Sequence, residues 1–277
     1  MLEPCILFRP GLSEEAEEQV ARQHFPVYHY RAEVPAGSLV VGRYSFLPFY
    51  NELEKDVELL GSRLINSFRQ HQYVAQLEYA QELADVTFPT WFRYEDVPHA
   101  ARNQPFVVKG RTNSRKFEWG SKMFAKDFQA AVRIGADLAT DGLIGPQGVV
   151  LRQYVPLQTF EVGVTGTPIT NEWRIFYYQG QRLAHGYYWG AVIDDYAPVT
   201  EATPDFEAHG LPFADAIALR LVDKVPFVVL DIAKDVRGRW WLVELNDGSQ
   251  AGLNGTVDAQ TLFSGLRQVL LAKGARR

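Results

Sequence analysis

Two carboxylates and one amide in the C-terminal part of the chain, Asp231, Glu244 and Asn246, form a set of side chains that can hold a metal ion. They follow two apolar runs, 226–230 and 239–243, which are separated by a polar turn that contains a glycine. Such runs predict the two strands of a β-hairpin, and in an antiparallel pair Asp231 and Glu244 can meet at the strand ends. Glu244 and Asn246 are two positions apart, so their side chains point to the same face.

Oxygen ligands of this kind suit Mg²⁺, which completes its octahedral shell with waters and with the phosphate oxygens of a nucleotide. The alternative is a hairpin whose acidic side chains are merely solvated. The sequence Val-Glu-Leu-Asn at 243–246 favours the metal site, because polar groups inside an apolar strand are costly unless they have partners.

A strand that ends in a lysine and continues into a basic loop is a second candidate site. The segment PFVVK at 105–109 ends with Lys109, and the small and polar residues 110–114 lead on to Lys116 and Gly120. Lysines at both ends of a flexible loop, with backbone N–H groups between them, suit the binding of phosphates. A solvated basic loop without a ligand is the alternative.

The segment VVLRQYVPL at 149–157 predicts a strand that Pro156 stops, because proline cannot donate a hydrogen bond to a sheet. The backbone of Gln153, Tyr154 and Val155 is then free to pair with the edge of a flat heterocycle such as adenine. Taken alone, this motif is common and does not identify a site.

A second hairpin is predicted at 171–188, where apolar and polar residues alternate before a turn at Gly180. Glu172 and Arg174 share one face of its first strand. They are candidates for contacts with a ligand, and a cross-strand ion pair on the surface is the alternative.

In this order, the four segments resemble the ATP-grasp superfamily. Its C-terminal signature is an acid, a second acid and an asparagine, followed by a loop of small residues such as 248–252. Lys109, Lys116 and the Glu-Trp-Arg sequence at 172–174 further resemble a clade that is frequent in phages and bacteria and is named for one arginine and two lysines. The resemblance covers residues 106–253, roughly half of the chain.

The resemblance implies that the cofactors are ATP and Mg²⁺. The implied contacts are the α-phosphate and adenine side at Lys109, the phosphates at Lys116, adenine at Gln153, Tyr154 and Val155, the ribose at Glu172, the γ-phosphate at Arg174, and Mg²⁺ at Asp231, Glu244 and Asn246. Arg174 and Lys116 are the implied catalytic residues, because they offset charge on the transferring group. Glu161 competes with Glu172 for the ribose, since many ATP-grasp enzymes place this acid soon after the interdomain hinge that holds adenine, here residues 153–155.

The implied fold mixes α+β and α/β structure. A small N-terminal pre-ATP-grasp α/β lobe, residues 1–100, precedes an ATP-grasp domain, residues 101–277. That domain divides into a nucleotide-binding subdomain at 101–153 and a C-terminal metal- and phosphate-binding subdomain at 154–277, two α+β lobes with the nucleotide between their antiparallel sheets. Residue patterns predict strands at 4–8, 27–30, 39–44 and 88–92 and helices at 13–23, 51–61, 72–83, 126–140, 213–221 and 258–271.

Composition excludes several other classes of protein. The chain has 277 residues, a formal net charge of −5 and one cysteine, so it has neither a basic footprint for nucleic acid nor an internal disulfide framework. Cys5 lies in an apolar run and is expected to be a buried strand thiol. No apolar run is long enough to span a bilayer, and the first residues lack the pattern of a signal peptide, so we expect a cytoplasmic protein without a membrane partner.

The predicted function is that of an ATP-dependent carboxylate–amine ligase. In such an enzyme ATP phosphorylates a carboxylate, and an amine displaces phosphate from the acyl phosphate to form an amide or peptide bond, with release of ADP. A phosphotransferase that stops at phosphorylation and a non-catalytic ATP-binding regulatory module are the alternatives. The sequence does not reveal the oligomeric state or the two substrates, which range from small molecules to peptides; Arg43, Tyr44, Ser45 and 248–254 are candidates for contacting them.

Overall fold

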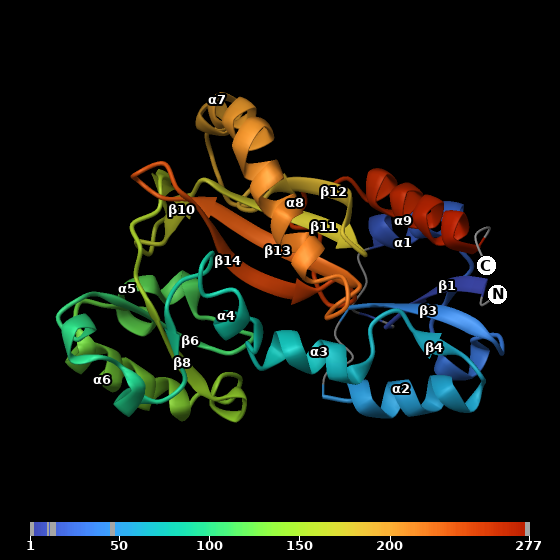
Figure 1. The fold of residues 1–277 in the computed structure, drawn as a ribbon, viewed down its shortest axis with the longest axis horizontal. Coiled ribbons are helices and arrows are strands. Elements are labelled where there is room, and N and C mark those ends of the chain that lie inside the picture. The colour runs from blue at the N-terminus through green and yellow to red at the C-terminus, as the bar shows by residue number, and fades with distance from the viewer. Residues whose placement is uncertain (1–2, 10, 12–14, 45–47, 275–277) are drawn as a thin grey trace.

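The computed structural model describes residues 3–9, 11, 15–44 and 48–274. Within these residues the strands form three four-stranded sheets and one two-stranded hairpin (Figure 1). The beginning of the predicted helix 13–23 and the candidate residue Ser45 lie outside the described part of the chain. None of the described helices combines the length and the apolar character that crossing a membrane requires.

The N-terminal lobe is a parallel sheet with the strand order β2-β1-β3-β4. Its elements are β1 (Glu3–Phe8), α1 (Glu15–His24), β2 (Val27–Tyr28), β3 (Ser38–Arg43), α2 (Tyr50–Leu59) and β4 (Arg63–Leu64). Helices cover both faces, so β1 and β3 are apolar and almost continuously buried, as is typical of parallel strands. Cys5 lies in β1 as expected, and burial raises the pKa of its thiol to about 11.

The single helix predicted at 72–83 is wrong, because the chain forms α3 (Phe68–Ala75) and α4 (Tyr79–Glu82) with a break between them. At the break, Leu77 adopts a left-handed φ of 58°. The change of direction buries Tyr79 completely and lets its hydroxyl accept a hydrogen bond of 3.3 Å from the Leu245 N–H. Tertiary packing therefore overrides a helical pattern at this position.

The second lobe is an antiparallel sheet with the order β5-β8-β6-β7. It consists of β5 (Thr90–Trp91), β6 (Phe106–Gly110), β7 (Phe124–Ala125) and β8 (Val149–Gln153), and α6 (Phe128–Ala139) packs against it. Asp127 caps α6 by accepting a hydrogen bond from the Ala130 N–H at 2.8 Å. The β5 strand precedes residue 100 and pairs with β8, so this sheet contains strands from both sides of the predicted domain boundary. The boundary itself stays a prediction.

The third sheet is antiparallel and lies at the centre of the molecule, with the order β12-β11-β13-β14 (Figure 1). Its strands are β11 (Glu172–Tyr178), β12 (Gln181–Tyr187), β13 (Phe227–Lys234) and β14 (Trp240–Asp247). The register places Arg174 opposite Asp231 and Asp231 opposite Glu244. The predicted approach of the two acids is thus confirmed, but both lie inside their strands rather than at the ends, because the strands extend beyond the apolar runs.

The two faces of the third sheet have different partners. One face packs Trp173, Ile175 and Tyr177 into a core that includes residues of α7 (Ala197–Asp205) and α8 (Leu211–Arg220). On the other face, Phe176 and Tyr178 join a core with α1 and α9 (Ala259–Gly274), whereas Glu172 and Arg174 lie further along the same face. A hairpin of β9 (Thr159–Val162) and β10 (Pro168–Thr170), which the sequence patterns did not predict, connects the second and third sheets.

Close packing on β12 supplies a test of this arrangement. Gly186 pairs with Arg174, and a Cβ at Gly186 would lie 2.6 Å from the backbone carbon of Thr256. We expect Gly186→Ala to destabilise the protein by about 1–3 kcal/mol, because the added methyl group forces the backbone apart. Denaturant unfolding measures the change, and Gly142→Ala, whose Cβ would meet no atom within 4 Å, is the control. Equal stability of the two variants would contradict the close packing.

Candidate active site

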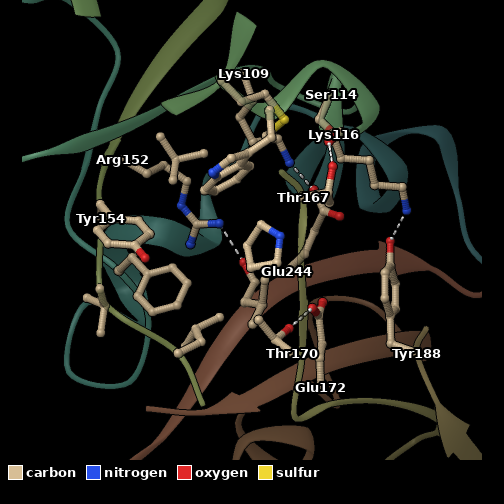
Figure 2. A pocket seen from close by; sticks show the side chains of 18 of the residues that line it. Lys109, Ser114, Lys116, Arg152, Tyr154, Thr167, Thr170, Glu172, Tyr188 and Glu244 are labelled. Carbon is tan, nitrogen blue, oxygen red and sulfur yellow. Dashed lines mark hydrogen bonds and ion pairs between the residues drawn. The ribbon is translucent and has the colours of Figure 1, made fainter. Parts of the chain in front are cut away.

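A cavity of about 150 Å³ lies between the second and third sheets (Figure 2). Both sheets and the segments that connect them contribute to its wall: Lys109, Ser114, Lys116, Arg152, Gln153, Tyr154, Val155, Thr167, Thr170, Glu172, Tyr188, Trp189 and Glu244 are among the lining residues. Of the residues predicted for a nucleotide site, Arg174 and the metal candidates Asp231 and Asn246 do not line this cavity.

One end of the cavity is formed by the predicted hinge. The Phe124 ring packs edge-on against Tyr154, with 5.1 Å between the ring centroids. The N–H groups of Gln153 and Tyr154 donate to the carbonyls of Pro89 and Pro105, each at 2.9 Å. Among the described residues, the Val155 N–H has no hydrogen-bond partner. The hinge therefore offers an unpaired backbone donor beside an aromatic wall, which suits a flat heterocycle.

Glu172 lies buried at the floor of the cavity. Its Oε2 accepts hydrogen bonds from the Thr170 hydroxyl and the Trp189 indole, both at 3.1 Å. Burial, together with the charge of Asp231, raises the pKa of Glu172 to about 7. Its competitor Glu161 does not line the cavity and instead accepts a hydrogen bond from the Asp194 N–H at 3.1 Å.

Arg174 and Asp231 form a bidentate ion pair inside the third sheet. Arg174 Nε donates to Asp231 Oδ1 and Nη2 donates to Oδ2, each at 2.8 Å. The second terminal nitrogen donates to the Gly252 carbonyl and to Asn254 Oδ1. Burial alone would lower the pKa of Arg174, but the Asp231 carboxylate outweighs it and raises that pKa. The guanidinium thus stays charged in a buried position.

A second ion pair joins the two sheets across the cavity. Lys109, from β6, donates to Glu244 Oε1, from β14, and Figure 2 shows these two side chains meeting. Burial by itself would raise the pKa of Glu244, but the positive charges of Lys109, Arg152 and Arg174 lower it. Glu244 therefore remains a carboxylate that requires a cation beside it.

The loop after β6 is docked on the third sheet through Lys116. The loop contains the short helical turns Lys116–Glu118 and α5 (Trp119–Lys122). Lys116 Nζ donates to the Tyr188 hydroxyl at 3.0 Å and lies 4.9 Å from the centroid of the Trp189 ring. Burial lowers the pKa of Lys116, an effect that the charges of Glu172 and Asp231 oppose. Both predicted lysines thus lie at the cavity.

The donor set predicted for Mg²⁺ lies on one face of β13 and β14. Asn246 Nδ2 donates to Asp231 Oδ2 at 3.0 Å, which leaves the amide oxygen for another partner. In the described ranges, no group of three or more His, Cys, Asp or Glu side chains is placed to hold a metal ion. Two acids and an amide nevertheless fit Mg²⁺, because this ion keeps several waters and phosphate oxygens in its shell.

Several residues at the cavity were not predicted from the sequence. Arg152 donates to the Val243 carbonyl at 2.5 Å and to Thr87 Oγ1 at 2.9 Å, and so connects the second and third sheets. Tyr188 lies between two cations, because the Arg174 guanidinium is 4.9 Å from its ring centroid and Lys116 bonds its hydroxyl. The sequence offered two signals for these residues: the charge of Arg152 directly before the hinge, and the adjacent aromatic residues Tyr188 and Trp189.

The expectation that Arg43 contacts a substrate is wrong. Arg43 is fully buried, and its Nε donates to Glu17 Oε1 at 2.8 Å. A terminal nitrogen donates to the Gly248 carbonyl. Tyr44 also bonds Glu17. Because α1 supplies a carboxylate at this point, Arg43 holds the N-terminal lobe to the loop after β14 instead of facing a ligand.

Comparison with known proteins identifies the family of this chain. The model of an ATP-grasp domain, family 3 of the clade named for one arginine and two lysines, matches residues 98–266, and the chain belongs to this family. This membership confirms both the resemblance and the mixed α and β fold expected from the sequence. No curated protein matches the sequence significantly.

Solved structures share the fold at low sequence identity. A RiPP-associated ATP-grasp ligase from Chryseobacterium gregarium, in complex with ADP and a leader and core peptide, has a TM-score of 0.57 and 10% identity, with 99% of this chain and 97% of that chain covered. D-cycloserine synthetase DcsG has a TM-score of 0.55 and 13% identity, with 96% and 99% covered. The ligase PsnB, complexed with precursor peptide PsnA2 and AMPPNP, has a TM-score of 0.55 and 13% identity, with 98% and 99% covered.

The raised pKa of Glu172 predicts a pH-dependent stability. The unfolded chain loses this proton near pH 4.5 and the folded protein near pH 7, so the folded state binds more protons between these values and stability falls as pH rises through that window. We expect the free energy of unfolding of Glu172→Gln, relative to that of the wild type, to rise by on the order of 3 kcal/mol from pH 4.5 to pH 8. Urea unfolding at both pH values measures it, and a constant difference would contradict the prediction.

Proposed function

We propose that the protein is an ATP-dependent carboxylate–amine ligase that forms an amide or peptide bond and releases ADP. The observation that carries this proposal is the line of charges that runs from Arg174 through Asp231 and Glu244 to Lys109. The two cations and two carboxylates lie next to a cavity whose hinge has an unpaired N–H donor at Val155. These are the components needed to bind a nucleoside triphosphate with a divalent cation.

Each part of ATP has a proposed place in the cavity or, for phosphates at Arg174, directly beside it. Adenine lies at Gln153, Tyr154 and Val155, with the Val155 N–H as donor, and the ribose hydroxyls lie at Glu172. Lys109, Lys116 and Arg174 bind the phosphates. The buried position of Glu172 in the cavity wall favours it over Glu161 for the ribose.

The metal site is proposed at Asp231, Glu244 and Asn246. These three side chains would hold Mg²⁺, which would supply positive charge that neutralises part of the phosphate charge. Asp231 and Glu244 are held by Arg174 and Lys109 in this structure, and incoming phosphates would give those two cations new anionic partners. The same exchange would release carboxylate oxygens for the metal.

The chain contributes positioning and charge neutralisation to the reaction. Arg174 and Lys116 are proposed to offset the charge on the γ-phosphoryl group as it passes to the substrate carboxylate. The docked loop at 111–122 would exclude water from the acyl phosphate, which water would otherwise hydrolyse. An amine then attacks the acyl carbon, and inorganic phosphate leaves.

Measurement of ADP release with Mg-ATP, followed by mass spectrometry of the products, tests the proposed function. A panel of amino acids and short peptides is suitable, because the structural neighbours include a synthetase of a small molecule and ligases solved with peptides. Release of ADP that requires both a carboxylate and an amine supports the ligase. A phosphorylated product without amide would indicate a phosphotransferase, and nucleotide binding without turnover would indicate a regulatory module.

The carboxylates of the proposed metal site supply a first prediction for activity. We expect Asp231→Asn and Glu244→Gln each to lower turnover by a factor on the order of 10² or more, because each variant loses a carboxylate that would hold Mg²⁺, and with it the positive charge that would stabilise the transferring phosphoryl group. Turnover is measured at saturating Mg²⁺, and Asp223→Asn, at an exposed position, is the control. Near-normal turnover of both site variants would refute the metal assignment.

The loop that carries Lys116 supplies a prediction about motion. Few of its side chains are buried, since all residues from 111 to 120 are exposed or only partly buried. We expect its amide hydrogens to exchange quickly without a nucleotide and more slowly with Mg²⁺ and a non-hydrolysable ATP analogue, as Lys116 moves onto the phosphates. Hydrogen exchange on residues 110–120 decides the matter, and equal rates in both states would exclude a nucleotide-gated lid.

A further inference from the structure

A second cavity, of about 210 Å³, lies beside the proposed metal site. Glu244 lines both cavities, and Asn246 lines the second one, so the second cavity begins where the phosphates of a nucleotide would end. Its wall comes from α3, from the loop after β6 and from the end of β14, and it includes His71, Val74, Arg111, Thr112, Asn113 and Asp247. This position makes the second cavity a candidate site for the group that reacts with an activated carboxylate.

Asp247 acts only as a hydrogen-bond acceptor at the wall of this cavity. Its Oδ1 accepts from Asn66 Nδ2 at 2.7 Å and from the Ser249 N–H at 2.9 Å. Its Oδ2 accepts from the Tyr50 hydroxyl at 3.1 Å and lies 3.1 Å from His71 Nδ1. The other three partners of this carboxylate are donors, so we assign the imidazole hydrogen to His71 Nδ1, which donates it to Asp247.

The orientation of His71 follows from these contacts. Its ring stacks on the Tyr50 ring, with 4.5 Å between centroids and 16° between planes, and only 5% of the residue is exposed. With Nδ1 bound to Asp247, the lone pair at Nε2 is the part of the imidazole left for a ligand of the cavity. A histidine that a buried carboxylate fixes in one tautomer is the arrangement of a general base.

We propose that the second cavity binds the amine substrate and that His71 accepts the proton of the attacking nitrogen. This inference rests on the proposed ligase function. An α-amino group is largely an ammonium ion at neutral pH and cannot attack until it loses a proton. In the step itself, the C–N bond forms, the bond from the acyl carbon to the phosphate oxygen breaks, and phosphate leaves with the electron pair. The nitrogen gives up two protons in all: the ammonium proton passes to His71 Nε2 before the attack, and the departing phosphate takes the second proton as the amide forms. Asp247 is the positioning residue.

The choice of nucleophile separates the role of His71 from phosphorylation of the carboxylate. Hydroxylamine is uncharged at neutral pH and attacks acyl phosphates without a base, whereas an amino acid amide is charged and needs one. The experiment supplies Mg-ATP and each of the twenty standard amino acids as the carboxylate. It then compares hydroxamate formation with hydroxylamine to amide formation with alanine amide, in the wild type and in His71→Asn.

The expected result is a split between the two products. His71→Asn keeps a donor for Asp247 but has no base, so amide formation should fall by a factor on the order of 10²–10⁴ while hydroxamate formation changes little. His209→Asn, at an exposed position, is the matched control and should leave both products unchanged. His71→Gln is the second variant, and for each protein the melting temperature with and without Mg²⁺ and AMPPNP shows whether the nucleotide site is intact.

Two results would overturn the inference while leaving the ligase function in place. Loss of both products in the His71 variants, with nucleotide binding retained, would assign His71 to phosphorylation or to the shape of the site. Retention of both products would remove it from the chemistry. The wild type itself could form neither hydroxamate nor ADP with any amino acid or with the short peptides of the panel. That result would refute the proposed function and, with it, the role of His71.

Discussion

The structure depends on how two neighbouring carboxylates inside the third sheet are neutralised. Asp231 and Glu244 lie directly opposite each other on adjacent strands, where like charges destabilise a sheet. Each therefore needs a cation, and the two cations come from different places: Arg174 lies on the neighbouring strand of the same sheet, whereas Lys109 comes from the second lobe. Separating such a pair leaves a charge without a partner, which costs far more free energy than the intact pair contributes to stability. Because Lys109 and Glu244 come from different lobes, their ion pair restricts the position of one lobe against the other.

The same constraint connects the fold with the proposed chemistry. Cations that neutralise carboxylates are also suited to phosphates, and carboxylates that require cations are also suited to Mg²⁺. A nucleotide with its metal can therefore replace both ion pairs without leaving a buried charge unpaired. The second cavity begins at Glu244, so the proposed amine site and the nucleotide cavity share this residue, and the histidine with its aspartate lies just beyond it. The proposed nucleotide, metal and amine sites therefore adjoin one another.

Much of this could be predicted from the sequence, because strands with a period of two fix the faces of Glu172, Arg174, Glu244 and Asn246, and membership of the ATP-grasp family fixes the order of the segments. The misses have a common physical origin in contacts between distant parts of the chain. The break at Leu77 follows from the burial of Tyr79, and the burial of Arg43 follows from Glu17, which lies on a helix that packs beside it. The His71–Asp247 pair spans 176 positions, and no local pattern marks either residue.

Mg-ATP is expected to exchange the partners of the two ion pairs. A crystal structure of the protein with Mg²⁺ and a non-hydrolysable ATP analogue tests it most directly. If this exchange occurs, the nitrogen atoms of Lys109 and Arg174 bond phosphate oxygens, and Glu244, Asn246 and Asp231 supply oxygens to the metal at about 2.0–2.1 Å. A complex in which both ion pairs remain intact while the phosphates lie elsewhere would contradict it.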